Sequence, residues 1–213
     1  MTVASMSCVR IVVLGARKAG KSAVTVRYLT RRFIGEYSSS KDLLYRHEVC
    51  VDSHHCQVEI LDTSRSQDDV FPADKVDWAD AFVVVYSTAD RRSFQVATDS
   101  LRRIQQHVAG RHAPIILLGN KKDLEHARQV SVDDGQEMSL QFQCQFYEVS
   151  AADTHVGVTV AFQSILREAF SQKSKRTLPI KQKLGAMTVS KIIGTVFGKV
   201  VKNDKKKRPS LSF

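Results

Sequence analysis

The chain alternates short apolar runs with segments in which apolar residues recur every three or four positions. Runs of the first kind predict buried β-strands, here at 9–14, 45–51, 56–62, 81–86, 114–119 and 145–149. Segments of the second kind predict helices at 21–30, 91–108, 131–142 and 156–171. Asp90 is placed to cap the second helix, and the spacing of Ser131 and Asp134 predicts a capping box for the third.

Alternating strands and helices predict an α/β fold with a mostly parallel six-stranded sheet and helices on both faces. The second and third runs flank a turn expected at 52–55, so this hairpin adds one antiparallel edge strand. In such sheets, ligands bind beyond the carboxyl ends of the strands. Binding residues are therefore expected directly after Leu14, Asp62, Gly119 and Val149.

Positive charge is concentrated at one end of the chain. The net charge is +10, but from Ser171 to Phe213 twelve Lys and Arg face one acid, Asp204, which leaves the preceding segment close to neutral. A nearly neutral body argues against a nucleic-acid-binding globular domain. No apolar run approaches the roughly 18 residues of a membrane span. The first residues lack a signal-peptide pattern and position 2 is Thr, so we expect neither secretion nor N-myristoylation.

The cysteines fit no zinc-binding spacing. We expect reduced, mostly buried thiols of a cytosolic protein at Cys8, Cys50, Cys56 and Cys144. His54 and His55 fall within the predicted turn, where solvated side chains are expected rather than a metal site.

The segment after the first strand has the pattern G-x-x-x-x-G-K-[ST] and precedes a helix. Backbone N–H groups of such a loop point at phosphate oxygens, its lysine neutralises the outer phosphates, and its last hydroxyl can ligate Mg²⁺. We therefore predict that a nucleotide's phosphates bind at Gly15, Ala16, Arg17, Lys18, Ala19, Gly20, Lys21, Ser22 and Ala23.

Polar residues also follow the third and fifth strands. Asp62 ends a strand near the phosphate loop, where its carboxylate can hold Mg²⁺ through water. A fixed carboxylate at Asp123 can accept hydrogen bonds from guanine N1–H and the exocyclic amine, a pattern that adenine does not offer. Asn120 and Lys121 can brace the base and the phosphate loop.

The last strand is followed by Ser150, Ala151 and Ala152. A backbone N–H of this segment can meet the guanine carbonyl. Together with Asp123, it predicts a guanine-binding end of the site.

Four motifs in order (GARKAGKS, LDTS, NKKD and VSA) resemble those of the Ras branch of small GTPases, across about residues 8–170. The segments VRYLTRRFIGEY and DWADAFVVVYS are similar to the branch that includes the estrogen-regulated growth inhibitor and its relatives. The resemblance implies a P-loop G domain at 8–171, between an N-terminal extension at 1–7 and a basic tail at 172–213. It also implies binding of GTP or GDP with Mg²⁺.

By the same resemblance, Phe33 packs on the guanine, and Ser40 stands where the family has its Mg²⁺-ligating threonine. The metal set is then Ser22, Ser40 and Asp62. Switch I would lie at about 37–45 and switch II at about 62–78, and both would bind effector proteins. We expect a monomer.

The resemblance implies two catalytic positions, Lys21 and Ser66. Lys21 matches the family pattern, but Ser66 and several neighbouring positions do not. Arg17-Lys18 replace a glycine pair, Arg65 replaces the glycine that meets the γ-phosphate, and Ser66 replaces the glutamine that orients the attacking water. The base-site lysine is Ala152. We expect a GTPase with weak intrinsic activity.

Three alternatives stay open at this centre. Gln67 could replace the missing glutamine, and Arg17 or Arg65 could act as an internal arginine finger. The third is a GTP-binding scaffold that no longer cycles and is localised by its tail.

Apolar residues in the tail recur at helical spacing, with lysines off the stripe and a final cluster at 205–208. The segment 184–208 suits an anionic membrane surface, a nuclear import receptor, or a solvated tail. Because the last four residues include no cysteine, we expect no prenyl anchor. We expect a cytoplasmic protein that associates with a membrane surface or the nucleus or nucleolus through this tail.

Overall fold

The computed structural model describes residues 8–37, 41–64 and 72–177. The chain divides into two units, Met1–Ser171 and Gln172–Phe213. The predictions for 1–7, Ser40, Arg65, Ser66, Gln67 and the segment 184–208 lie outside the described residues.

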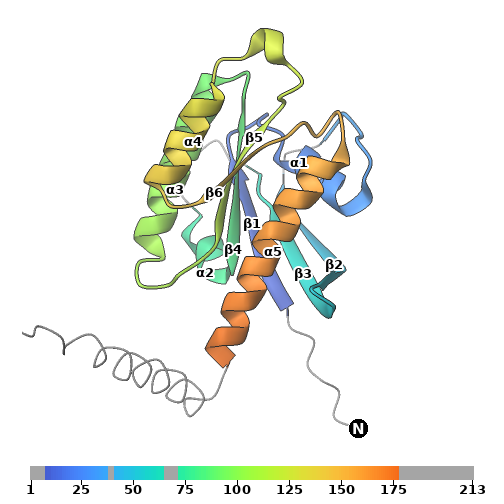
Figure 1. The fold of residues 1–213 in the computed structure, drawn as a ribbon, viewed down its shortest axis with the longest axis vertical. Helices are drawn as coiled ribbons and strands as arrows, with labels where there is room; N and C mark the ends of the chain where they lie inside the picture. Colours follow the sequence, from blue (N-terminus) through green and yellow to red (C-terminus); the bar gives the residue numbers. More distant parts are fainter. Residues whose placement is uncertain (1–7, 38–40, 65–71, 178–213) are drawn as a thin grey trace, which may run out of the picture. The chain divides into compact units, whose positions relative to one another are not determined.

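The six strands form one sheet in the order β2-β3-β1-β4-β5-β6 (Figure 1). Neighbouring strands are parallel except for β2, which pairs antiparallel with β3 at one edge. The predicted sheet is therefore confirmed. Its strands are β1 (Cys8–Gly15), β2 (Leu43–Val51), β3 (His54–Asp62), β4 (Ala81–Ser87), β5 (Ile115–Asn120) and β6 (Gln145–Glu148).

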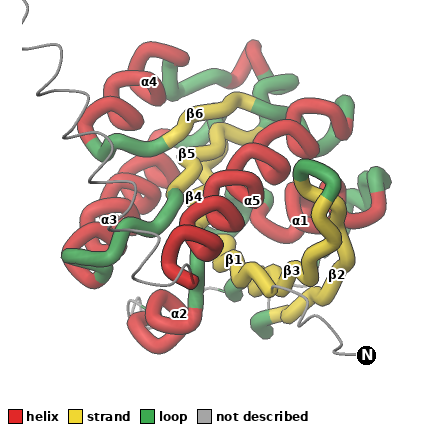
Figure 2. The backbone as a smooth tube through the Cα atoms, turned by 60° about the horizontal axis from the view of Figure 1, so that its bottom comes forward, coloured by secondary structure: helices red, strands yellow, loops and turns green. Residues whose placement is uncertain are grey.

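Helices cover both faces of the sheet, with α1 and α5 on one side and α2, α3 and α4 on the other (Figures 1 and 2). Strand β1 divides its side chains between two cores. Ile11 and Val13 pack in the core with Phe162 of α5, whereas Val12 packs in the core with Leu101 of α3. Burial on both faces explains the nearly continuous apolar strands. The helices are α1 (Lys21–Thr30), α2 (Ala73–Trp78), α3 (Arg91–His107), α4 (Val132–Gln141) and α5 (His155–Thr177).

Both predicted helix caps are confirmed. The Asp90 side chain accepts from the backbone N–H groups of Arg92 and Ser93, and Ser131 and Asp134 form a capping box. Helix α5 runs six residues further than predicted, to Thr177. The short helices α2 and η1 (Glu125–Ala127) were not predicted, because three to six residues are too few to show a helical period.

The predicted turn at 52–55 is wrong in length. The hairpin turns on two residues, Asp52 and Ser53, with φ of 47° and 67°, and Val51 already pairs with His54. Two-residue hairpin turns of this kind match the twist of the strands but require positive φ at both positions. His54 and His55 therefore belong to β3.

The prediction of mostly buried thiols is also wrong. None of the four cysteines forms a disulfide, but only Cys56 is buried, and Cys50 is exposed on the edge strand β2. Among the described residues, no three or more His, Cys, Asp and Glu side chains come together as a metal-binding cluster. In the same part of the chain, no helix is both long and apolar enough to cross a bilayer.

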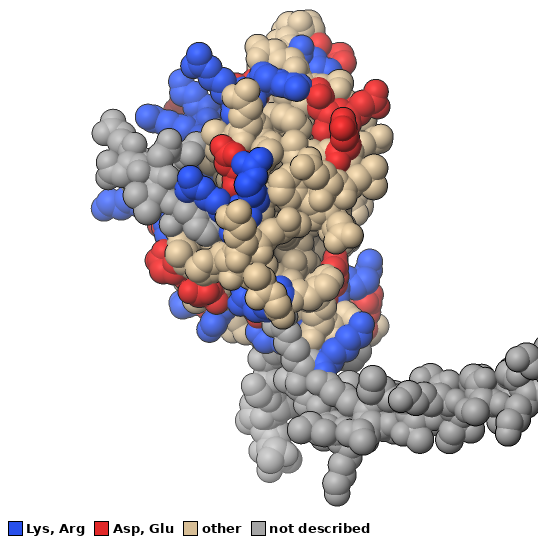
Figure 3. Space-filling model, turned by 90° about the vertical axis from the view of Figure 1, so that its left-hand side faces the viewer, with Lys and Arg blue, Asp and Glu red and all other residues tan. Residues whose placement is uncertain are grey.

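The distribution of charged side chains on one face of the molecule can be compared with the net charge of the sequence. On the face seen in Figure 3, acidic and basic side chains are interspersed among uncharged ones. This distribution agrees with a body that is nearly neutral apart from its basic end.

Tyr86 on β4 has a buried hydroxyl that finds no hydrogen-bond partner among the described residues. A Cβ atom would come within 2.7 Å of this hydroxyl if added at Gly119, and within 2.9 Å if added at Gly135. The two glycines therefore leave the space that the hydroxyl occupies. Burial raises the pKa of the phenol. The ring is well packed, but its hydroxyl loses the hydrogen bonds that water would give it.

We therefore expect Tyr86→Phe to raise the free energy of unfolding by about 1 kcal/mol, or the Tm by about 2–4 °C. Thermal unfolding at saturating nucleotide measures this. Tyr147→Phe is the control, because the Tyr147 hydroxyl has a partner in Gln145. A lower Tm for Tyr86→Phe would contradict the absence of a partner.

Candidate nucleotide-binding site

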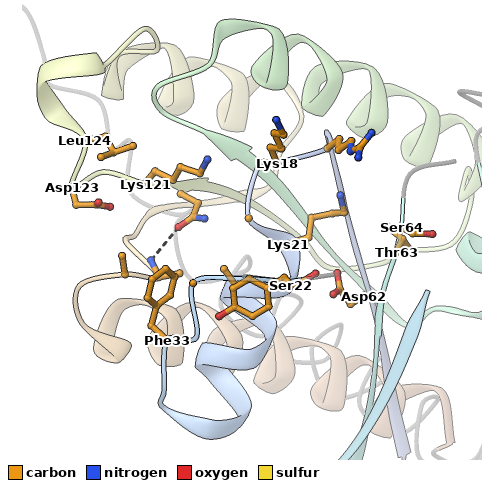
Figure 4. A pocket seen from close by; sticks show the side chains of 18 of the residues that line it. Lys18, Lys21, Ser22, Phe33, Asp62, Thr63, Ser64, Lys121, Asp123 and Leu124 are labelled. Atoms are coloured by element: carbon orange, nitrogen blue, oxygen red, sulfur yellow. Dashed lines mark hydrogen bonds between the residues drawn. The ribbon is translucent and has the colours of Figure 1, made fainter. Parts of the chain in front are cut away.

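The carboxyl ends of β1, β3 and β5 and the segment after β6 bring all four motifs to one pocket of about 450 Å³ (Figure 4). Lys21, Asp62, Thr63 and Ser64 lie toward one end in that view, and Phe33 and Asp123 toward the other. The lining residues are Arg17, Lys18, Gly20, Lys21, Ser22, Ala23, Phe33, Gly35, Tyr37, Lys41, Asp62, Thr63, Ser64, Asn120, Lys121, Asp123, Leu124, Ala151 and Ala152.

The loop between β1 and α1 needs its two glycines. A Cβ atom at Gly15 would meet the Val85 carbonyl oxygen at 2.1 Å, and one at Gly20 would meet Asn120 Nδ2 at 2.2 Å. Lys21 is buried, and its Nζ donates to the carbonyls of Gly15 and Ala16 at 3.1 and 3.0 Å. The ammonium is thus fixed inside the loop at the start of α1, where the first backbone N–H groups of a helix favour an anion.

Lys18 has a strained backbone conformation in this loop. Its φ is 62°, in the left-handed region that a residue with a Cβ adopts at a cost of about 1 kcal/mol. The family resemblance places a glycine here. The loop therefore keeps the backbone path of a phosphate loop although Arg17 and Lys18 have replaced its glycine pair.

The metal end of the pocket is formed by Asp62 and Ser22. The Asp62 and Ser22 side chains lie side by side there (Figure 4). Burial raises the pKa of Asp62, and the neighbouring Ser22 hydroxyl and the Lys21 charge oppose that rise. Its Oδ1 is buried without a partner among the described residues, which leaves an acceptor for a further ligand.

Asn120 joins the two ends of the site. Its Nδ2 donates to the Ala19 carbonyl at 3.0 Å, and its Oδ1 accepts from the Ala151 N–H at 3.1 Å (dashed line in Figure 4). The side chain is buried, so both bonds are sheltered from water. Of the three residues expected to meet the guanine carbonyl, Ala151 thus already uses its N–H within the protein.

Four predicted residues do not line the pocket, and three of them hold residues that do. Gly15, Ala16 and Ala19 offer their carbonyls to Lys21 and Asn120. The fourth, Ser150, accepts from the backbone N–H of Asp153 at 3.0 Å.

Six lining residues were missed in the sequence. Leu124 directly follows the NKKD motif, and Thr63 and Ser64 follow Asp62, so adjacency to a motif was the available signal for these three. Tyr37 and Lys41 lie within the expected switch I. The sixth is Gly35, whose φ of 86° marks a turn after Phe33.

A contact between the two expected switches was also missed. Asp42 accepts from both the N–H and the hydroxyl of Ser64, at 2.7 and 2.8 Å, and forms an ion pair with Lys75 of α2. We call these three residues the Asp42 clasp. Burial alone would raise the pKa of Asp42, but the hydrogen bonds from Lys75 and Ser64 outweigh it and lower this pKa.

Comparison with known proteins agrees with this geometry. The Ras family model matches residues 10–171. The Ras-related and estrogen-regulated growth inhibitor-like protein of Bos taurus is 37% identical over 204 residues, which cover 91% of this chain and 98% of the relative. Ras-like protein family member 12 of Danio rerio is 40% identical over 186 residues, covering 85% and 73%.

A third relative is the Ras-related and estrogen-regulated growth inhibitor of Homo sapiens. It is 36% identical over 160 residues, which cover 75% of this chain and 80% of the relative. The match to the family model spans most of the chain and includes every motif that lines the pocket. The chain therefore belongs to the Ras family, as a small GTP-binding signalling protein of the branch that holds the estrogen-regulated growth inhibitor and the Ras-like family members.

Proposed function

We propose that this chain binds GTP and GDP with Mg²⁺ in the pocket described above and hydrolyses GTP slowly. The observation that carries the proposal is the pairing of two chemistries in one pocket. Lys21, Ser22 and Asp62 suit phosphate and metal at one end, and Asn120 and Asp123 suit guanine at the other.

The residues at the metal end fit Mg²⁺. The buried Asp62 Oδ1 has no partner among the described residues, and a hydroxyl beside a carboxylate is the oxygen donor set that Mg²⁺ prefers. Ser22 and Asp62 would hold the ion, with Ser40 as the third predicted ligand. When bound, Mg²⁺ neutralises charge on the phosphates. Lys21, fixed by its carbonyl contacts, would place its ammonium against the same phosphates.

The slow step in this proposal is hydrolysis. Serine at position 66 is too short to orient water as a glutamine does, and this orientation is a large part of catalysis in the class. Arg17 is exposed at the rim of the pocket and would obstruct an arginine from an activating protein. The same two residues support the alternative of a scaffold that binds GTP without cycling.

We propose the two switches as the binding surface for effector proteins. The start of β2 lies in the expected switch I, and Leu43 and Leu44 are 43% and 45% exposed there. The edge of β2 that faces away from β3 has no strand beside it within the described sheet. A partner could therefore contact both apolar side chains and backbone groups at this edge.

One experiment separates the two functions. Nucleotide is extracted from the purified full-length chain and identified by chromatography, as prepared and after incubation with GTP. Bound GDP that replaces added GTP supports a slow GTPase, and GTP that persists unchanged supports the scaffold. A chain that neither carries nor takes up guanine nucleotide would overturn both.

We further propose that the tail sets location. Removing residues 184–213 is expected to leave nucleotide binding intact and to change the distribution in cells, because this segment carries clustered lysines and an apolar stripe. Fluorescent fusions of the full-length and truncated chains measure this. Recruitment to the plasma membrane and accumulation in the nucleus separate the two targets, and identical distributions would reduce the tail to a solvated segment.

A further inference from the structure

Helix α1 contains a buried arginine, Arg27, that does not line the nucleotide pocket. Arg27 is 9% exposed. Its Nη1 donates to the Arg31 carbonyl at 2.9 Å, and its Nη2 donates to the carbonyl of Asp153, with a longer contact of 3.5 Å to that of Ala152. A buried guanidinium is costly unless it is hydrogen-bonded, so these carbonyls decide where it sits.

The carbonyls belong to the two sides of the guanine end. Arg31 ends α1 in a left-handed conformation with φ of 60°, and Phe33 enters the pocket two residues later. Ala152 also lines the pocket, and it follows Ala151, whose N–H is bonded to Asn120. A single guanidinium thus bonds to the backbone behind both Phe33 and the 150–153 segment.

We propose that Arg27 is a positioning residue for the guanine end of the site. It lines no part of the pocket itself but fixes the separation between Phe33 and the 150–153 segment. The inference rests on the function proposed above. Ala152 stands where the family pattern has a lysine, and alanine has no side chain with which to brace the base, so bracing from behind carries more weight here.

The chemistry calls for arginine at this position. A guanidinium presents several N–H groups in a fixed plane and can donate to carbonyls on two sides, whereas an ammonium is a single compact point of charge. Lysine should therefore keep the charge and most of the packing but lose part of the bridge. Methionine should keep only the packing.

Arg27→Met is expected to speed GDP dissociation about tenfold, which is within the range found for residues that act on a ligand through others. GDP and GTP should be affected by the same factor, because both use the same base pocket. Preference for GTP over ITP, which lacks the exocyclic amine, should narrow, because Asp123 reads that amine on a base held less firmly. Arg27→Lys should lie between Arg27→Met and the native chain.

The test uses the full-length chain with excess Mg²⁺. Dissociation of fluorescently labelled GDP and of a non-hydrolysable GTP analogue is followed by displacement, and ITP competition gives base selectivity. Arg111→Met is the matched control, since Arg111 also donates to backbone carbonyls, those of Val76 and Asp77, and lies outside the pocket. Tm at saturating GDP is measured for every variant.

Faster release with narrowed GTP–ITP selectivity in both Arg27 variants, and neither change in Arg111→Met, supports the positioning role. A lower Tm with native release rates would overturn it and leave Arg27 as a stability residue. Unequal effects on GDP and the GTP analogue would also overturn it, since they would place the change at the phosphate end. If the native chain bound no guanine nucleotide, the proposed function itself would fail; binding by the native chain with unchanged variants would remove Arg27 alone.

Discussion

Replacing Ser66 with glutamine and Arg17 with glycine together is expected to raise the single-turnover rate of GTP hydrolysis on the order of 100-fold. The glutamine restores a side chain long enough to hold the attacking water, and positioned groups of this kind contribute 10²-fold or more. The glycine opens the rim of the pocket, where Arg17 is exposed in the native chain. An arginine finger from an activating protein is worth on the order of 10³–10⁵ in rate, so the opened rim matters most when such a protein is present.

Rates are measured on preloaded GTP for the native chain, each single variant and the double variant. A Ras-type activating protein should accelerate only variants that contain glycine at position 17. The contrary outcome is specific: rapid native hydrolysis that collapses in Arg17→Gly would make Arg17 an internal finger. Dissociation of GDP from each variant controls for changed binding.

Asp123→Asn is expected to weaken GTP binding on the order of 100-fold and to shift preference toward xanthine nucleotides. Two hydrogen bonds to a carboxylate are worth about 1.5–3 kcal/mol each, and an amide presents a donor where guanine also has one. Xanthine carries a carbonyl at that position, so the amide N–H regains an acceptor.

Competition of labelled GDP by GTP, XTP and ATP measures the shift. Asp99→Asn serves as a control, because Asp99 is an exposed residue of α3 whose side chain pairs with Arg102. Native binding of ATP as tight as GTP would contradict the guanine-reading role of Asp123.

Much of the fold could be predicted because it is written locally. Apolar runs between turn residues mark strands, and Asp90, Ser131 and Asp134 mark helix starts through hydrogen bonds within three residues. The hairpin turn was misjudged because neither Asp52 nor Ser53 is a glycine, the residue that most often signals positive φ. Helix α2 was missed because only Val76 of its six residues is buried.

The contacts behind the site could not be predicted in the same way. Motif spacing places Lys21, Asp62, Asn120 and Asp123 at strand ends, and the pocket brings them together. Arg27, however, reaches residues more than a hundred positions away, and nothing in its local sequence distinguishes it from an exposed helix arginine. Contacts of this kind form only after the strands have assembled in their final order, which brings α1 next to the segment after β6.

The Asp42 clasp also weakens the electrostatic field that an approaching partner would meet at the start of β2. Asp42 precedes the exposed Leu43 and Leu44, but its carboxylate is already matched by Lys75 and Ser64 within the protein. A neutralised ion pair contributes little to long-range attraction. Asp42 itself would therefore add little to the electrostatic attraction of a partner that docked on the β2 edge, where apolar contact and backbone pairing are available.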